Sequence, residues 1–575
     1  MMSSKLKSQK GIHVDIWFVT TVFCMLFFIL GLVYPILKIF RLSVINGEGE
    51  FTLAYFAKFF GKPYYLKALF NSLKVSVCAT LCAVVLGTII AYIMRTMKIA
   101  GKGVLDIIII ITMLSPPFIG AYSWILLLGR SGSITTLIKN LTGITLPSIY
   151  GFPGMLLVFT MQLYPLIYLY VSGALKNMDN SLLEAAENFG CTGIKRVFRV
   201  VLPLIAPMML SGGLLVFMRS MADFGTPQLI GEGYRTMPYL IYNEFISEMG
   251  GDDGFAATLS VLMVILTTVL FLIQKWISKK MSFSMSATNP VQPKKYHGWK
   301  NVLAHIFVYL VVLIGLMPQL TVTYTSFKKT SGRIFVDGFS LDSYRVAFSK
   351  MGGCIRNTFV FSILAVAIIV IIGTLIAYIT IRRPNLATNL LDILTMMPYI
   401  IPGSVMGIAL LLGFNKRPLM LVGTVTIIIL AYVLRRMPYT IRSSAAILSG
   451  IHPSIEEAAI SLGASNLKTL MKVIAPESTP GAIIGAVTFI KVTAPMMAPG
   501  VLSGAILSWM TIISELSASV LLYVNKTQTM TIAIYTEVVR ANYGTAAALS
   551  VMLTLTTVIV LLVFFKISGS REISL

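Results

Sequence analysis

Two acidic residues lie within long apolar segments of the sequence, where charged side chains are rare. Asp223 and Glu515 each lie late in a long apolar segment, at equivalent positions 292 residues apart. If such a segment spans a membrane, an ionisable group inside it is energetically costly and often lines a transport pathway. Hard carboxylate oxygens suit a hard metal cation. The alternative is a structural or gating role, in which the carboxylates bond helix ends or Arg219.

The chain shows no pattern typical of an enzyme. A GxxxxGK(S/T) sequence, the phosphate-binding loop of nucleotide hydrolases, is absent. No nucleophile or acid–base constellation stands out, and the five cysteines form no CxxC pair. The histidines are scattered along the chain and indicate no metal site: His13, His297, His305 and His452. We therefore expect a non-enzymatic protein that has no cofactor of its own.

The strongest signal is a pattern that occurs twice in polar loops. Each copy reads Glu-Ala-Ala, three residues, Gly, nine residues and Val-x-(Leu/Ala)-Pro. Its members are Glu184, Ala185, Ala186, Gly190 and Pro203 in the first copy, and Glu457, Ala458, Ala459, Gly463 and Pro476 in the second, 273 residues later throughout. A plain surface helix explains one such loop, but hardly two alike.

Each loop predicts a short amphipathic helix. Ser181 and Ser454 are expected to cap the two helices, which places Glu184 and Glu457 in the favourable first turn. The alanine pair leaves a smooth face that another protein can approach closely. The glycine permits a turn that a β-carbon would obstruct, and the proline restarts the chain toward the next span.

The elements that carry these residues are membrane helices. Of 575 residues, 56% are hydrophobic and only 12% are charged, whereas a soluble domain carries about 25% charge. Repeated runs of about 20 apolar residues predict an all-α polytopic membrane protein. We expect twelve spans, at 17–40, 72–94, 104–128, 154–176, 207–230, 256–277, 302–325, 358–381, 390–413, 418–446, 499–523 and 545–566.

The spans form two groups of six that repeat one another. An offset of 286 aligns Asn71 with Asn357 and Gly87 with Gly373. We place the repeats at 1–277 and 301–575, with a cytoplasmic linker at 278–300. Two such halves imply a parallel repeat about an axis along the membrane normal, with the pathway between them.

Some residues inside the spans receive plain structural predictions. Asp106 and Asp392 sit at the start of spans three and nine, where we expect them to cap helices. Prolines break both spans: Pro116, Pro117, Pro398 and Pro402. Such breaks can expose backbone groups to a cavity, but kinked packing is the commoner outcome. Tyr164 and Tyr168 are interpreted as packing or interface aromatics.

Basic residues indicate the orientation. Lysine and arginine gather in loops that share one side if both termini are cytoplasmic. The net charge of +24 is thus interpreted as a cytoplasmic bias toward anionic lipid, not as affinity for nucleic acid. The acidic loop 231–254 falls on the opposite side. It is either a solvated external loop or a functional surface. In the second case it docks a partner protein or attracts cations to the entrance of the pathway.

The paired loops resemble the EAA loop of ABC-importer permeases, whose pattern is EAA-x3-G-x9-I-x-LP. The sequences Asp223-Phe224-Gly225-Thr226-Pro227 and Glu515-Leu516-Ser517-Ala518-Ser519 resemble fused permeases of the ferric-iron importer type. The resemblance covers essentially the whole chain. It implies a type I permease fold in the bacterial cytoplasmic membrane and a role in moving ferric iron.

The resemblance also implies partners. Loops 181–203 and 454–476 would form coupling helices, each seated on one of two nucleotide-binding subunits that hold ATP and Mg²⁺. An extracytoplasmic binding protein would deliver the cargo. Relatives of this type imply other cargoes: 2-aminoethylphosphonate, thiamine, polyamines or sugar phosphates. A secondary transporter of 6+6 design is a rival interpretation, although it would not need two EAA loops.

One feature departs from the family pattern. KVIAPESTPG at 472–481 recurs as KVTAPMMAPG at 491–500. About 19 residues are therefore inserted between the second loop and span eleven. The apolar part, 481–490, is too short to cross a bilayer, so we expect an interfacial or re-entrant helix there.

Overall fold

The computed structural model describes residues 16–114, 116–246, 252–280, 289, 291–455, 458 and 493–568. Contacts divide the chain into two compact units. Unit 1 holds 1–33, 365–398 and 433–508, and unit 2 holds 34–364, 399–432 and 509–575. Helices dominate, and one antiparallel hairpin pairs β1 (Lys328–Ser331) with β2 (Ile334–Phe339).

The helices follow the sequence prediction closely. The first half contains α1 (Ile16–Phe28), η1 (Ile29–Val33), α2 (Tyr34–Val44), α3 (Ala54–Gly61), α4 (Pro63–Thr96), α5 (Lys102–Leu114), α6 (Pro117–Leu128), α7 (Ser133–Thr142), α8 (Phe152–Lys176), α9 (Asn180–Asn188), α10 (Gly193–Arg196), η2 (Val197–Val201), α11 (Leu202–Ala222), α12 (Gly225–Ile230), α13 (Met237–Ile246) and α14 (Asp253–Lys280). The second half contains α15 (Trp299–Phe327), α16 (Asp342–Arg382), α17 (Leu386–Ile400), α18 (Gly403–Gly413), α19 (Val425–Gly450), α23 (Ala494–Ile513), α24 (Ser519–Leu522), η4 (Asn525–Thr527), α25 (Met530–Val539) and α26 (Tyr543–Ser568).

The expected twelve spans are not all simple helices. In the described part of the chain nine helices are long and apolar enough to cross a membrane, or eleven if two bent pairs each count as one span. The pairs bend by 101° after Met113 and by 112° after Ile400. These are breaks rather than the kinks that we predicted. The predicted span 418–446 is helical as α19, but three arginines interrupt its apolar character: Arg435, Arg436 and Arg442.

Glycines bring the long helices together at equivalent places in both halves. In unit 2, a β-carbon on Gly87 of α4 would lie 2.7 Å from Ile167 Cβ of α8. In unit 1, a β-carbon on Gly373 of α16 would lie 3.4 Å from Thr440 of α19. Ile167 and Thr440 are themselves 273 residues apart. The repeat seen in the sequence therefore corresponds to a repeated helix contact.

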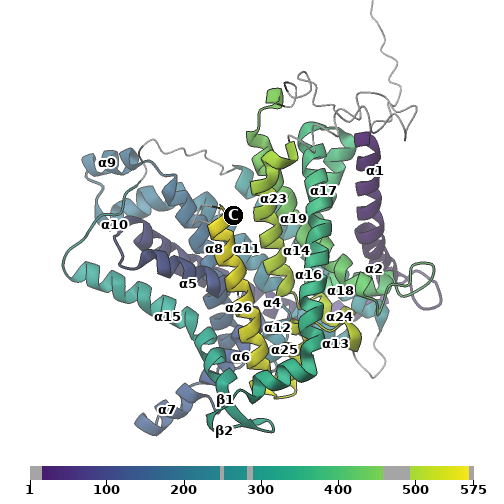
Figure 1. The fold of residues 1–575 in the computed structure, drawn as a ribbon, viewed down its shortest axis with the longest axis horizontal. Helices are drawn as coiled ribbons and strands as arrows, with labels where there is room; N and C mark the ends of the chain where they lie inside the picture. The colour runs from purple at the N-terminus through teal and green to yellow at the C-terminus, as the bar shows by residue number, and fades with distance from the viewer. Residues whose placement is uncertain are drawn as a thin grey trace, which may run out of the picture. The chain divides into compact units, whose positions relative to one another are not determined.

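The first helix of each half packs on the broken span of the other half. Within unit 2, α15 contacts α5 and α6, and α2 contacts α18 (Figure 1). The second contact is tight, because a β-carbon on Gly413 would lie 3.0 Å from Pro35 Cβ. These reciprocal contacts connect the two halves of the chain at the two broken spans.

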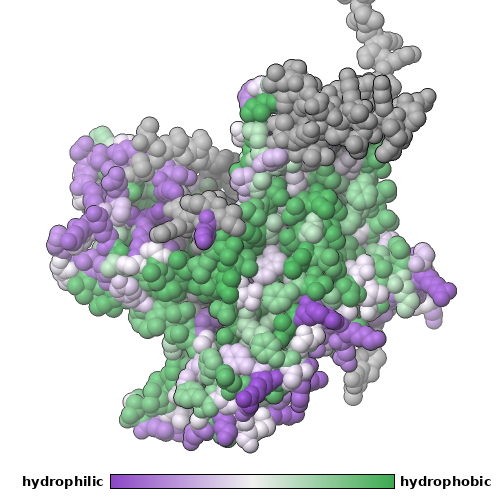
Figure 2. Space-filling model, viewed as in Figure 1, coloured by the Kyte–Doolittle hydropathy of each residue, from purple (hydrophilic) through white to green (hydrophobic). Residues whose placement is uncertain are grey.

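Unit 2 has two distinct ends. Helix α9 and the end of α26 lie at one end, and the β1–β2 hairpin lies at the other (Figure 1). The segment before α15 joins the α9 end, because Lys294 N donates to Thr96 O at 2.9 Å and Asn180 N donates to Asn289 O at 2.8 Å. Figure 2 shows hydrophilic residues gathered over α9 and α10 and apolar surface over α5 and α15. The described segments around Lys98, Asn180 and Lys294 thus share one end of unit 2.

Candidate coupling helix and pathway residues

Helix α9 contains the first Glu-Ala-Ala copy, but its start differs from the prediction. Asp179 caps the helix, and its Oδ1 accepts from Ser181 N at 2.9 Å. Glu184 consequently lies beyond the first turn, where its Oε1 accepts from Asn180 Nδ2 at 2.6 Å. The predicted roles of Ser181 as cap and Glu184 as first-turn charge are wrong. Aspartate is an equally good cap, and it stands two residues earlier.

The end of α9 depends on Gly190. This glycine has a φ of +75°. Its N–H donates to Glu187 O at 2.9 Å, and Cys191 N donates to Ala186 O at 2.8 Å. These two bonds form a Schellman motif, which needs a left-handed residue at this position. The predicted turn is confirmed, but its cause is backbone conformation, since no atom lies within 4 Å of where a β-carbon would be.

An ion pair fixes α9 to the membrane helices. Arg196 of α10 lies 3.1 Å from Glu187 of α9, and its charge acts on the hydroxyl group of Tyr92 in α4. Arg196 is mostly buried, with 20% of its side chain exposed. The sequence pattern had not singled out Glu187 or Arg196. The available signal in the sequence was a pair of opposite charges, nine residues apart, on either side of a glycine turn.

The outer face of this segment is apolar and exposed. Phe189 is 89% exposed, Ile194 77% and Phe198 66%. Leu183 is buried on the inner side, whereas Glu184 and Ala185 face outward. Large apolar side chains that protrude from a polar end of a molecule mark a surface for another protein.

Pro203 does not restart the chain as predicted. Residues Gly193–Ala222 form one helix of 30 residues that passes through it. The π-helical turn η2, Val197–Val201, stands immediately before the proline. A π turn is one of the standard ways in which a helix absorbs a local break in its hydrogen bonding.

Most of the second copy lies outside the described residues: Glu457, Ala459, Gly463 and Pro476. Ala458 is helical and exposed. Ser454 does not cap, since 453–455 are already helical and Ser454 N donates to His452 Nδ1 at 3.3 Å. The repeated segment 472–481 and the stretch 481–490 also lie outside the described residues.

Asp223 and Glu515 make the same contact in the two halves. Asp223 Oδ1 accepts from Thr226 N at 2.9 Å, at the start of α12. Glu515 Oε1 accepts from Ala518 N at 3.1 Å, just before α24. Glu515 is 4% exposed, Asp223 is half-buried, and their charges act on one another. These bonds match the alternative in which the carboxylates hold helix ends, while contact with cargo stays a prediction.

The chain turns at Asp223, so the predicted span 207–230 ends at Ala222. The other two aspartates do not cap helices as predicted. Asp106, inside α5, accepts a hydrogen bond from the hydroxyl group of Tyr168. Asp392, inside α17, lies 3.1 Å from Arg442. Asn385 caps α17 instead, because its Oδ1 accepts from Thr388 N at 2.9 Å.

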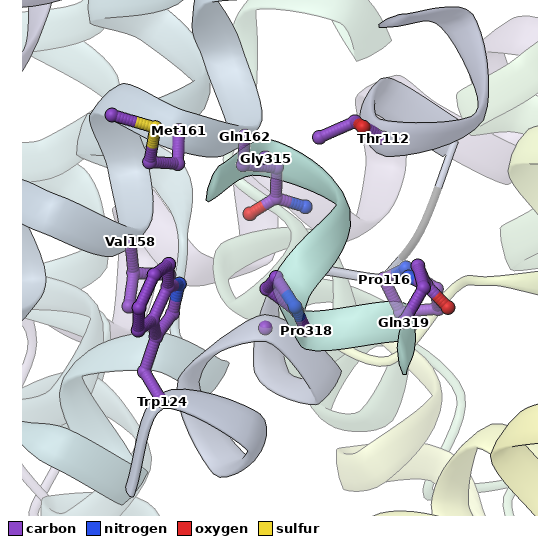
Figure 3. Close-up of a pocket in the computed structure, with 10 residues that line it drawn as sticks. Thr112, Pro116, Trp124, Val158, Met161, Gln162, Gly315, Pro318 and Gln319 are labelled. Atoms are coloured by element: carbon purple, nitrogen blue, oxygen red, sulfur yellow. The ribbon is translucent and has the colours of Figure 1, made fainter. Parts of the chain in front are cut away.

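A small pocket opens at the break between α5 and α6. Helices α8 and α15 close it, and the side chains of Trp124, Gln162 and Gln319 line it beside Pro116 (Figure 3). Its ten lining residues are all uncharged. Among the residues that the structure describes, no three His, Cys, Asp or Glu side chains gather as a metal site.

Comparisons with known proteins agree with this architecture. A family model described as "binding-protein-dependent transport system inner membrane component" matches residues 83–283 and 369–488. Ferric transport system permease protein FbpB of Actinobacillus pleuropneumoniae is 27% identical over 99% of this chain and 80% of that protein. Putative ferric transport system permease protein FbpB 1 of Haemophilus influenzae is 27% identical over 84% of this chain and 77% of that protein.

A shorter relative resembles one half. Molybdenum transport system permease protein ModB of Escherichia coli is 29% identical over 37% of this chain and 93% of that protein. The family model matches both halves, as the internal repeat requires. This chain therefore belongs to the family of binding-protein-dependent transport system inner membrane components.

Proposed function

We propose that this chain is the fused permease of an importer for ferric iron. Family membership makes it a membrane-embedded transport subunit that works with an ATPase and a binding protein. The relatives named for ferric transport align with most or all of its length, whereas the one named for molybdenum aligns with little more than a third. Cargo identity rests on those names.

The observation that carries the mechanism is the exposed apolar face of α9. Asp179, Gly190 and the Glu187–Arg196 pair hold the helix rigidly, while Phe189 and Ile194 protrude. We assign this face to one ATPase subunit, and the loop 454–476 to a second. ATP and Mg²⁺ bind to those subunits, and this chain needs no cofactor.

The helix Gly193–Ala222 supplies a direct mechanical link. It begins beside α9 and ends at Asp223. Thirty residues of helix span about 45 Å, enough to cross the bilayer. Movement of the α9 loop when the ATPases close is thus carried to the opposite end of the pathway. Rocking of two halves about a shared axis gives alternating access.

We infer that both termini are cytoplasmic. The segments around Lys98, Lys294 and α9 share one end of unit 2, and the excess of basic residues in these loops assigns that end to the cytoplasm. The β1–β2 hairpin and α13 then face outward (Figure 1), where the binding protein docks.

A substitution at Phe189 tests the docking surface. Phe189→Glu places a charge in the proposed contact between α9 and its ATPase subunit and should lower the amount of ATPase that co-purifies with the chain. Phe339→Glu is the matched control, because Phe339 is 73% exposed but lies in β2 at the other end. Equal loss of ATPase in both variants, or in neither, contradicts the assignment.

A ligand panel tests the cargo. The purified complex with its ATPase should show binding-protein-stimulated ATP hydrolysis with Fe³⁺-loaded binding protein. Molybdate, 2-aminoethylphosphonate, thiamine, spermidine and a hexose phosphate should leave the basal rate unchanged. Stimulation by one of these and not by Fe³⁺ would replace ferric iron with that cargo.

A further inference from the structure

Helices α13 and α25 are equivalent parts of the two repeats. Each contains ten residues. Met237 N donates to Ser72 Oγ at 2.7 Å, and Met530 N donates to Thr358 Oγ1 at 2.7 Å. The two methionines are 293 residues apart, and the two hydroxyl residues 286. The same first-turn bond thus anchors both helices.

A second pair of bonds supports this equivalence. Asn71 Nδ2 donates to Arg235 O at 3.0 Å, ahead of α13. Asn357 Nδ2 donates to Gln528 O at 3.0 Å, ahead of α25. Arg235 and Gln528 are again 293 residues apart. The asparagines matched in the sequence therefore hold the same loop in each half.

Tyr242 and Tyr535 occupy one and the same position in these two helices, 293 residues apart. The two phenol groups lie within electrostatic interaction range of one another. Two residues related by a pseudo-twofold axis contact each other only if they lie on that axis. Phe224 packs against both rings, with centroids 4.2 Å from Tyr242 and 6.0 Å from Tyr535. Tyr535 is 8% exposed, and Tyr242 is half-buried.

The carboxylates lie beside the same axis. Asp223 directly precedes Phe224, and its charge interacts with that of Glu515, its repeat equivalent. A β-carbon on Gly225 would lie 3.4 Å from Leu516 Cδ2. Two tyrosines and two carboxylates therefore converge from both halves, all within unit 2.

We propose that Tyr242 and Tyr535 form the outer barrier of the pathway and are cargo-contacting residues for a hard metal cation. A pathway along the axis is closed while the two tyrosines touch, and it opens when the halves move apart. Separation frees two phenol oxygens at the entrance, ahead of the carboxylate pair. Oxygen donors of this kind suit hard cations. This inference rests on the proposed import function and names residues that neither the motif nor the repeat comparison had selected.

Cysteine cross-linking tests the barrier. The double variant Tyr242→Cys/Tyr535→Cys is made in the full complex, with the five native cysteines replaced and a protease site placed in the linker 278–300. Oxidation should keep the halves joined after proteolysis and should stop cargo uptake, and reduction should restore uptake. Uptake that continues in the cross-linked complex, or failure of the cysteines to cross-link, overturns the barrier.

Hydroxyl removal tests contact with the cation and does not depend on the cysteine variant. Tyr242→Phe/Tyr535→Phe keeps both rings and thus the barrier. Fe³⁺ uptake should fall at least tenfold, while ATP hydrolysis stimulated by loaded binding protein persists. Tyr122→Phe is the control, because it removes another buried hydroxyl, which donates to Tyr543 O at 3.1 Å. Normal Fe³⁺ uptake in the double variant refutes cargo contact.

The proposed import function and the tyrosine barrier can be refuted separately. A wild-type complex that takes up another cargo but no Fe³⁺ refutes the proposed function and the cation assignment together. A wild-type complex that imports Fe³⁺ while its oxidised double-cysteine form does so equally well refutes the barrier alone.

Discussion

Replacement of Gly190 by alanine isolates the contribution of the coupling turn. The residue has a φ of +75°, and no atom lies within 4 Å of the added β-carbon. The variant therefore introduces backbone strain without a steric clash. A left-handed residue other than glycine costs roughly 1–2 kcal/mol, so the closed Schellman turn becomes about 5- to 30-fold less populated relative to an open one.

Transport per ATP hydrolysed is the measurement that reports this change. If α9 transmits force through its rigid turn, Gly190→Ala should lower the coupling ratio severalfold while the ATPase stays bound through Phe189. Gly190→Asn should be milder, because asparagine adopts the left-handed conformation more readily. Gly173→Ala in α8 is the matched control, since that glycine also has no neighbour within 4 Å and lacks a positive φ.

The relative coupling ratios of these variants test whether the turn at Gly190 transmits force. The account predicts a coupling ratio that falls from wild type to Asn to Ala at position 190 and stays unchanged in Gly173→Ala. An unchanged ratio in Gly190→Ala, with normal transport, means that the turn does not transmit force.

Substitutions at three further positions test the supporting contacts. Arg196→Met should loosen α9 through loss of the Glu187 ion pair, an effect of about 0.2–1 kcal/mol that a double-mutant cycle on transport rate would measure. Glu515→Gln keeps an acceptor for the buried N–H and should retain the thermal stability of the complex. Glu515→Ala should lower the free energy of unfolding by about 1–3 kcal/mol. Equal stability of the two variants argues against the helix-end role. Asn357→Ala removes hydrogen bonds to two carbonyls of the loop before α25, each worth about 0.5–1.5 kcal/mol, so proteolysis of that loop should accelerate, and an unchanged cleavage rate would contradict this.

The repeat was predictable from the sequence because helix contacts depend on residue size at fixed spacing. Gly87 and Gly373 align in the sequence, and each meets the equivalent position of a partner helix. Asn71 and Asn357 likewise keep their loop contacts. The sequence predicts these contacts because a single small or polar side chain determines each of them.

Other features depend on contacts between distant segments and were predicted wrongly. Ser181 and Asp179 are both good caps, and only the path of the chain from the linker residue Asn289 selects Asp179. Asp106 looked like a helix cap because its partner, Tyr168, lies 62 residues away. The break at Pro116 lies where α15, from the second half of the sequence, packs against α6.

The tyrosine pair could not have been found by motif comparison. Tyr242 and Tyr535 belong to helices of ten residues, which are too short to be predicted as membrane spans. The available signal was the offset of 293, which matches Met237 with Met530 and the two tyrosines with each other. Recognition of that offset required the anchoring bonds to Ser72 and Thr358.

Fe³⁺ uptake into proteoliposomes tests the central claim most directly. The chain is reconstituted alone or with its ATPase, with loaded binding protein on the outer side and ATP inside. The account predicts uptake only when the ATPase and hydrolysable ATP are both present, with two ATPase subunits per chain. Uptake by the chain alone, driven by a proton or sodium gradient, would contradict it.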